Sequence, residues 1–251
     1  MANFWIGEGI KVIVFFAITY ALGKCMVQKG VKVNYTRKIF HFVFFFFPVL
    51  TTSIFPYEFS IELSLLSGGV LLGCLVAMRQ PIRARSQFLS TAYSSIDRPE
   101  DRPFTLVWVS TQILATYFVL ILMLLWLDRY DKSALISITW LIAGIGDGLA
   151  EPVGVRFGKR AYKVHALFTD RKYTRTIEGS LCVFFSGILA VALHAEVLSQ
   201  YQLILAMLII PIAMTFAEAL SPHTWDGPFL YLVGGISTVL VLEISQYGVS
   251  A

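Results

Sequence analysis

One uncharged apolar run constrains the fold of this chain more than any other feature. Phe104 to Leu127 extends for 24 residues without an Asp, Glu, Lys or Arg. About 20 mostly apolar residues are enough for a helix to cross the hydrocarbon core of a bilayer. The rest of the chain has the same character, since 57% of its 251 residues are hydrophobic and only 14% are charged. A soluble body of this size would lack the polar residues that coat its surface. We therefore predict an all-α, polytopic membrane helix bundle.

The apolar stretches divide the sequence into about eight predicted membrane helices. The first of them contains Glu8 and Lys11, which can pair at this spacing while the lysine extends to the membrane surface. Met1 to Gly9 contains no Lys or Arg, which argues against a cleaved signal peptide. The eight predicted helices span residues 5–23, 39–56, 59–78, 104–127, 133–155, 177–195, 198–219 and 227–244.

Basic residues collect in alternate connections between these helices. The connections 23–38, 79–103 and 156–176 contain 17 of the 20 Lys and Arg residues. Because Lys and Arg mark cytoplasmic loops, both termini are predicted to lie outside the cytoplasm. No internal repeat or Pro/Ser-rich linker divides the chain, so we predict a single integral membrane domain over residues 1–251. The N-terminus does not resemble a transit peptide, and a bacterial inner (plasma) membrane is the location we expect.

The Gly-rich stretch at residues 143–158, AGIGDGLAEPVGVRFG, carries two carboxylates at the cytoplasmic end of the fifth predicted helix. Carboxylates inside a membrane are costly and usually functional, and Asp147 and Glu151 together could hold Mg²⁺ while phosphates approach the bare backbone. Helix packing accounts for the glycines as well, but it gives no reason for the acids. Pro152 predicts a kink at this point. At helical spacing, one stripe contains Gly144, Asp147, Glu151, Gly154 and Gly158.

The connection 156–176 and the helix start that follows it form a second candidate region. The connection has seven Lys and Arg residues and one acid, a charge that would attract a polyphosphate. The same charges also orient helices and contact anionic lipid heads, so this function is not the only explanation for them. Thr176 is suited to cap the next helix, whereas Glu178 and Ser180 are candidates for the site.

Three residues at the cytoplasmic start of the second predicted helix could bind a phosphate or carry a proton. Arg37 and Lys38 lie four and three residues before His41, so the three side chains are neighbours on a helix. Basic residues at this end of a helix are also what membrane topology demands, so only His41, one turn further inside, favours a function.

Two further polar segments lie in predicted cytoplasmic connections. Glu218 and Asp226 flank a predicted hairpin with His223 between them, and they complete a set of acids on this face. Residues 97–103, DRPEDRP, repeat Asp-Arg-Pro and are interpreted as a rigid, solvated connector.

The depth of these candidates favours an enzyme over a transporter. A transport pathway tends to place polar groups at the midplane of the membrane, whereas the candidate residues all lie near the cytoplasmic surface. This position suits an enzyme that takes a soluble phosphate donor from the cytoplasm and a lipid acceptor from the membrane. The phosphate-binding sequence of soluble P-loop kinases, GxxxxGK[ST], does not occur.

Four segments of the sequence resemble the phytol kinase and dolichol kinase family. They are RKIFHF (37–42), GDGLAEPVGVRFGK (146–159), TRTIEGS (174–180) and EALSPHTWDGP (218–228). The resemblance implies a polytopic membrane enzyme that phosphorylates an isoprenoid alcohol, or diacylglycerol in a related branch, typically with CTP. Two positions depart from the family pattern: Glu151 stands where many relatives have Asp, and Gly227 stands where Asn commonly follows the acid. The second departure leaves the role of Asp226 open.

The chemistry and the resemblance together define the candidate site. Asp147, Glu151 and His41 are predicted to be catalytic, with Asp147 and Glu151 as ligands of Mg²⁺. The residues predicted to bind nucleotide or substrate are Arg37, Lys38, Gly146, Gly148, Gly154, Lys159, Arg175, Glu178, Gly179 and Ser180.

The predicted reaction is in-line transfer of a phosphoryl group from CTP, or another nucleoside triphosphate, to an isoprenoid alcohol such as phytol or another polyprenol. The expected partners are this nucleotide, the lipid alcohol and membrane lipids, and we expect no nucleic acid. A cytidylyltransferase that forms a CDP-lipid, a CTP-dependent diacylglycerol kinase and a transporter remain alternatives. The sequence leaves open which alcohol is used, whether CTP or ATP is the donor, and the oligomeric state. His41 and an acid are both candidates for the group that takes the hydroxyl proton.

Overall fold

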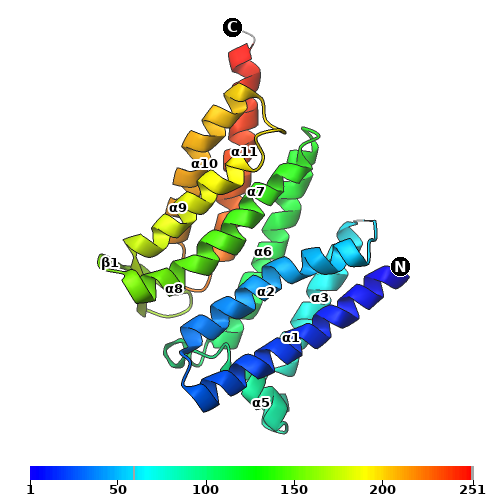
Figure 1. Cartoon of the computed structure of the whole chain (residues 1–251), viewed down its shortest axis with the longest axis vertical. Coiled ribbons are helices and arrows are strands. Elements are labelled where there is room, and N and C mark those ends of the chain that lie inside the picture. The colour runs from blue at the N-terminus through cyan, green and yellow to red at the C-terminus, as the bar shows by residue number, and fades with distance from the viewer. Residues whose placement is uncertain (59, 250–251) are drawn as a thin grey trace. The chain divides into compact units, whose positions relative to one another are not determined.

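The described part of the chain is almost entirely helical (Figure 1). We describe the protein from a computed structural model, which covers residues 1–58 and 60–249. Residue 59, with which the third predicted membrane segment begins, and residues 250 and 251 lie outside this description. Helices together with a single two-stranded sheet confirm the all-α class within the described residues.

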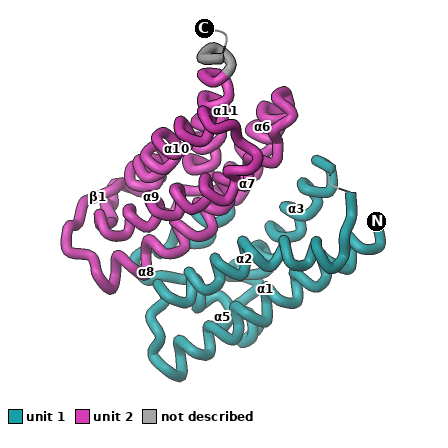
Figure 2. The backbone as a smooth tube through the Cα atoms, turned by 45° about the horizontal axis from the view of Figure 1, so that its top comes forward, with its two compact units in different colours: residues 1–111 teal, residues 112–251 magenta. Residues whose placement is uncertain are grey.

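The chain divides into two compact units, Met1–Thr111 and Gln112–Ala251, which Figure 2 shows in separate colours. The boundary falls within helix α6 (Thr105–Asp128). Each unit has its own buried apolar residues, and each therefore has a core of its own. The prediction of a single membrane domain over residues 1–251 stays a prediction.

Unit 1, residues 1–111, is built around the long first helix, which packs against α2, α3 and α5. Phe4, Leu75 and Met78 are almost completely buried in its core. Its connections 23–38 and 79–103 are themselves largely helical. The elements are α1 (Ala2–Lys29), α2 (Val33–Ile54), α3 (Ile61–Ala77), α4 (Gln80–Arg83), α5 (Gln87–Ser94), the 3₁₀ turn η1 (Pro99–Asp101) and the start of α6.

A glycine sets the close approach of α1 to α5. Gly23 is buried, and a Cβ atom added to it would lie 1.9 Å from the backbone oxygen of Thr91. No side chain larger than hydrogen fits at this distance unless the two helices move apart. Gly9 lies on the same helix, but a Cβ atom at that position would have no neighbour within 4 Å.

We expect Gly23→Ala to lower the stability of unit 1 by about 1–3 kcal/mol, because the new methyl group overlaps a carbonyl oxygen. Thermal unfolding of the purified protein in detergent measures this change. Gly9→Ala is the matched control, and it should leave stability unchanged or raise it slightly, since alanine favours the helix. Equal stability of the two variants would contradict the proposed packing.

Unit 2, residues 112–251, is organised around α9, which packs against α7, α8 and α10, while α10 packs against α11. Val183, Ile210 and Met214 are almost completely buried between these helices. The elements are the end of α6, the 3₁₀ turn η2 (Ser133–Leu135), α7 (Ile136–Leu141), the π-helical turn η3 (Ile142–Asp147), α8 (Gly148–Phe157), β1 (Ala161–His165), β2 (Lys172–Thr176), α9 (Ile177–Ala192), α10 (Gln200–Leu220) and α11 (Asp226–Val249).

The β-hairpin corrects one prediction. The basic connection 156–176 was predicted to be a loop, but residues 161–165 and 172–176 form antiparallel strands. The sequence AYKVH alternates outward and inward residues with the period of a strand, although five residues between two strong helices give only a short pattern. Lys163, Lys172 and Arg175, three of the seven basic residues of this connection, therefore lie on a small sheet.

Six helices among the described residues are long and apolar enough to cross a membrane. The other two predicted segments form α3 and α9, with 17 and 16 residues, or about 25 Å of helix at 1.5 Å per residue. All eight predicted segments are thus helical. The count of eight membrane helices and the location of the termini stay predictions. The six candidate spans are Ala2–Lys29, Val33–Ile54, Thr105–Asp128, Ser133–Phe157, Gln200–Leu220 and Asp226–Ser245.

Candidate functional site

The β-hairpin has one polar inner face and one basic outer face. Tyr162 pairs with Arg175 in the strand register, and both side chains point inward and are partly buried. Lys163 and Lys172 alternate with them and are exposed. The Lys163 Nζ atom donates to Thr174 Oγ1 at 2.6 Å. The hairpin thus directs Tyr162 and Arg175 into unit 2 and directs lysines outward.

The hairpin is held against the turn between α10 and α11. The rings of Tyr173 and His223 are nearly parallel, with centroids 3.6 Å apart and an angle of 5° between their planes. The backbone N–H of His223 donates to the carbonyl oxygen of His165 at 2.8 Å. An isolated β-bridge joins the same turn to Ala166. Stacking and backbone pairing therefore fix the hairpin on this end of the helices.

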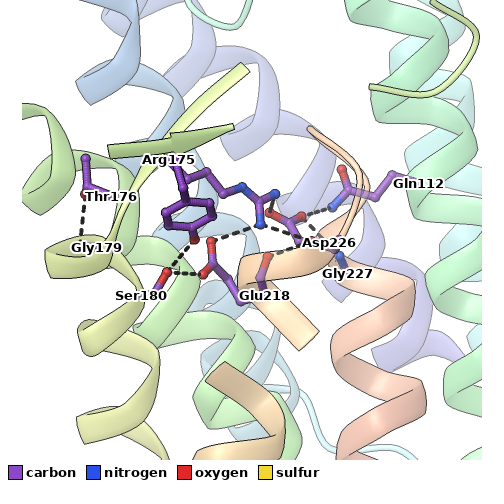
Figure 3. A network of polar contacts seen from close by, with 10 residues as sticks. Gln112, Arg175, Thr176, Gly179, Ser180, Glu218, Asp226 and Gly227 are labelled. Carbon is purple, nitrogen blue, oxygen red and sulfur yellow. Dashed lines mark hydrogen bonds and ion pairs between the residues drawn. The ribbon is translucent and has the colours of Figure 1, made fainter. Parts of the chain in front are cut away.

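Arg175 links the hairpin to both of these helices (Figure 3). Its Nη1 atom lies 3.2 Å from Oε1 of Glu218 and donates to Oγ of Ser221 at 3.1 Å. Its Nη2 atom lies 3.9 Å from Oδ2 of Asp226. Only 12% of the arginine side chain is exposed, so the guanidinium joins two acids in a largely enclosed position. Removing one partner of such an enclosed ion pair strongly destabilises the folded protein, because the remaining charge loses its counter-charge.

Glu218 is the most enclosed carboxylate of this group, with 4% of its surface exposed. Its second oxygen, Oε2, accepts a hydrogen bond of 2.9 Å from Ser180 Oγ. The Ser180 oxygen in turn lies 2.7 Å from the hydroxyl oxygen of Tyr162. Burial raises the pKa of the Tyr162 hydroxyl, and the nearby Glu218 charge adds to this effect. The tyrosine hydroxyl therefore keeps its proton and can donate it in a hydrogen bond.

Asp226 begins α11 and is held by neutral donors as well as by Arg175. Its Oδ1 atom accepts hydrogen bonds of 3.0 Å from Gln112 Nε2 and from the backbone N–H of Gly227. A Cβ atom at Gly227 would lie 2.6 Å from Thr116 Oγ1, so a larger residue would not fit here without a shift. Close packing on α6 therefore accounts for the glycine that follows Asp226 in this chain.

Asp147 lies at the end of the π-helical turn η3, immediately before α8. Such turns are rare and are frequent at functional sites. The residue is buried, and its charge acts on Glu218. Glu151, one helical turn further on, is partly exposed. Pro152 lies inside α8, and the change of helix type comes before it, within residues 142–147.

The predicted glycines bring α8 close to the beginning of α9. An added Cβ atom would lie 2.7 Å from Thr176 Oγ1 at Gly154, 2.6 Å from the Ala150 oxygen at Gly179, and 2.9 Å from the Val183 Cα atom at Gly146. Gly148 is also buried. These distances support the helix-packing interpretation of the glycines, and their predicted part in nucleotide binding stays a prediction.

The start of α9 matches the predicted cap. Thr176 Oγ1 accepts a hydrogen bond of 3.2 Å from the backbone N–H of Gly179. Glu178 lies in the first turn, and one of its oxygens accepts from the backbone N–H of Arg160 at 3.4 Å. Lys159 is exposed directly before the hairpin. Ser180 thus belongs to the polar network around Arg175, Glu218 and Asp226. The contact given for Glu178 is with the backbone before the hairpin, and Lys159 is exposed.

The predicted residues of the second helix lie in unit 1, whereas the other candidates lie in unit 2. Arg37 Nη1 lies 3.2 Å from Oδ2 of Asp101, a side chain that is completely buried. His41 stacks on Phe45 of its own helix, with ring centroids 4.5 Å apart. Lys38 is partly exposed. The roles predicted for Arg37, Lys38 and His41 stay predictions.

The segment 97–103 corrects part of a second prediction, because only four of its seven residues are exposed to solvent. Asp97, Arg98 and Asp101 are buried. Arg98 Nε lies 2.8 Å from Oδ2 of Asp101, and Arg102 Nε lies 2.7 Å from Oδ2 of Asp97. Each buried acid of DRPEDRP is therefore paired with an arginine of the same segment, although the Arg102 side chain itself is 60% exposed. The sequence spacing alone does not distinguish such pairs from solvated charges.

The predicted Mg²⁺ site stays a prediction. Within residues 1–58 and 60–249, no group of three or more His, Cys, Asp or Glu side chains could hold a metal ion. Magnesium commonly takes only one or two carboxylates from a protein and completes its shell with water and substrate phosphates. Asp147 and Glu151 remain the two carboxylates predicted for this role.

Three residues of the network were missed by the sequence reasoning: Gln112, Tyr162 and Ser221. Gln112 is an amide within an otherwise apolar run, which is a usable signal. Tyr162 and Ser221 are recognised only once the hairpin and the turn are in place.

Comparison with known proteins identifies no relative: no family model, no curated protein and no solved structure matches the chain. The resemblance to lipid-alcohol kinases therefore stays a prediction.

We expect Arg175→Ala to destabilise unit 2 by about 3 kcal/mol, because Glu218 and Asp226 would remain enclosed without their cation. Thermal unfolding in detergent measures the change. Lys172→Ala, on the same strand but exposed, is the control and should stay within about 0.5 kcal/mol of the parent protein. Equal losses in the two variants would show that the network does not hold the hairpin in place.

Proposed function

We propose that the protein is a lipid-alcohol kinase. It transfers a phosphoryl group from a nucleoside triphosphate, with CTP as the expected donor, to an isoprenoid alcohol such as phytol or another polyprenol. In this proposal the chain crosses the membrane eight times with both termini outside the cytoplasm, and the reaction takes place at the cytoplasmic face. A bacterial inner membrane remains the expected location.

The observation that carries this proposal is the convergence of three separate sequence segments in unit 2. Residues 146–159, 174–180 and 218–228 are far apart along the chain, and each contains part of the resemblance to lipid-alcohol kinases. Gly154 packs on Thr176, and Arg175 pairs with acids of the third segment. Residues that merely cap or orient separate helices would have no reason to meet in one network.

The donor side of the proposed site consists of Asp147, Glu151 and the outer face of the hairpin. Mg²⁺ held by the two acids would neutralise charge on the donor phosphates. Lys159, Lys163 and Lys172 are exposed near the same end of the helices and attract a polyanion by their charge. Long flexible cations of this kind can follow the phosphates without a preformed pocket.

The acceptor side is provided by the apolar surfaces of α9 and α10. Phe185 on α9 and Leu208 and Phe216 on α10 are each more than 60% exposed. Such large apolar side chains suit contact with lipid chains rather than water. An isoprenoid chain lying against them could bring its hydroxyl group to the polar network at the end of the two helices.

The test of the function is direct. Purified protein is incubated with CTP or ATP labelled in the γ-phosphate, Mg²⁺ and a panel that contains phytol, farnesol, dolichol and diacylglycerol. A kinase gives a labelled lipid phosphate and a nucleoside diphosphate. A cytidylyltransferase instead releases labelled pyrophosphate. Absence of a labelled lipid with every donor and acceptor contradicts the proposal, and transfer to diacylglycerol alone identifies a diacylglycerol kinase.

We expect Asp147→Asn to lower lipid phosphorylation at least about 100-fold, because the neutral amide binds Mg²⁺ poorly and the charge that stabilises the transferring group is lost. The rate of labelled lipid formation at saturating donor measures the effect. Asp131→Asn, an exposed acid elsewhere in unit 2, is the matched control and should retain full activity. Near-normal turnover of a folded Asp147→Asn protein would contradict the metal role.

A further inference from the structure

A continuous chain of hydrogen bonds leads from the β-hairpin to the buried Glu218. Ser180 Oγ donates to Glu218 Oε2 at 2.9 Å. A serine hydroxyl has a single hydrogen, and here it is used for the carboxylate. The Tyr162 hydroxyl, 2.7 Å from the same serine oxygen, must then be the donor in that contact. The three groups therefore point their protons in one direction, from Tyr162 through Ser180 to Glu218.

The cation beside Glu218 keeps it an ionised carboxylate, the form that can accept a proton. Arg175 Nη1 lies 3.2 Å from Oε1 and offsets its negative charge. Each carboxylate oxygen has about two acceptor positions, and each accepts one hydrogen bond or ion pair from a neighbour here. Each oxygen of Glu218 therefore retains acceptor capacity beyond its contact with Ser180 or Arg175.

Glu218 lies two residues before the end of α10 (Gln200–Leu220) and faces the interior of unit 2. Met214 and Ser221, one helical turn away on the same face, are buried, and Glu218 itself is only 4% exposed. The carboxylate is thus shielded from water, which would compete with the alcohol as phosphoryl acceptor. In the proposal the acceptor hydroxyl reaches it at the end of α10, not through the lipid-facing side of the helix.

We propose that Glu218 is the catalytic proton acceptor for the lipid alcohol, and that Ser180 and Tyr162 are positioning residues that orient it and connect it to the cytoplasmic side. This inference rests on the proposed kinase function. It assigns removal of the hydroxyl proton to a residue of unit 2, whereas His41, the candidate from the sequence, lies in unit 1.

The proposed step balances in atoms and charge. The alcohol oxygen forms a bond to the γ-phosphorus while the bond from that phosphorus to the β–γ bridging oxygen breaks, and its electron pair leaves with the nucleoside diphosphate. The hydroxyl proton passes to Glu218. After transfer, the hydroxyl groups of Ser180 and Tyr162 rotate, so that Glu218 donates to Ser180, Ser180 to Tyr162 and Tyr162 to water, and one proton leaves along this reversed chain.

The test measures kcat and the donor KM of Glu218→Gln with the lipid alcohol that the parent protein uses best. General bases contribute about 10²–10⁴-fold, and the loose transition state of phosphoryl transfer favours the lower value, so we expect kcat to fall about 100-fold. The donor KM should stay within about twofold. Glu243→Gln is the matched control, since Glu243 also accepts a hydrogen bond from a tyrosine, Tyr130, and it should retain full kcat.

A second measurement separates proton transfer from a structural effect. An alcohol acceptor fluorinated next to its hydroxyl group is more acidic and depends less on a base. With this acceptor, the ratio of the kcat of the parent protein to the kcat of Glu218→Gln should be smaller. A purely structural role of Glu218 would give the same kcat ratio with both acceptors, and this result would overturn the inference.

Milder variants keep the test decisive if Glu218→Gln does not fold. Ser180→Ala and Tyr162→Phe remove no charge, and we expect each to lower kcat about 5- to 20-fold at unchanged donor KM, the range implied by the loss of one hydrogen bond. Unchanged kcat in both overturns the inference, with Tyr130→Phe as control.

If the parent protein transfers no phosphoryl group at all, the kinase proposal itself fails. Transfer that survives in Glu218→Gln refutes only the role of Glu218.

Discussion

The pairing of Arg175 with Glu218 and Asp226 is the interaction on which the site depends. It joins a surface hairpin to two apolar helices, and without it two enclosed acids would lack a cation. Charges in such surroundings persist only when they are paired, so the pairing restricts where the hairpin can lie. Stacking of Tyr173 on His223 adds a second, uncharged contact at the same place. The basic surface is thereby held beside the buried acids.

The apolar pattern was enough to predict every long helix, because membrane-length apolar runs have few alternative structures. It did not predict the hairpin at residues 161–176, where five-residue strands are too short to give a strong period. It also could not show that Asp97, Arg98 and Asp101 are buried in ion pairs, since paired and solvated charges have the same composition. Local pattern therefore predicts elements well, whereas the pairing of charges depends on contacts between distant residues.

The candidate residues divide in a similar way. Thr176 acts as the predicted cap, because its partner Gly179 lies on the same helix. Ser180 was a candidate as well, but its partner Glu218 lies on α10. The glycines were assigned both to nucleotide binding and to packing. The short distances from an added Cβ atom to neighbouring atoms support the packing interpretation. Gln112 and Tyr162 were missed, because each meets its partner only through the tertiary fold. The sequence could therefore predict a contact together with its partner only where one helix supplies both residues, as at Thr176 and Gly179.

The π-helical turn before Asp147 makes the length of this segment matter as well as its composition. Each residue of an α-helix turns the chain by roughly 100°, so one residue fewer between Ile142 and Asp147 would rotate the carboxylate well away from its present direction. Gly146 would at the same time lose its position against Val183. Insertions and deletions in these six residues should therefore be far less tolerated than conservative replacements of the same side chains.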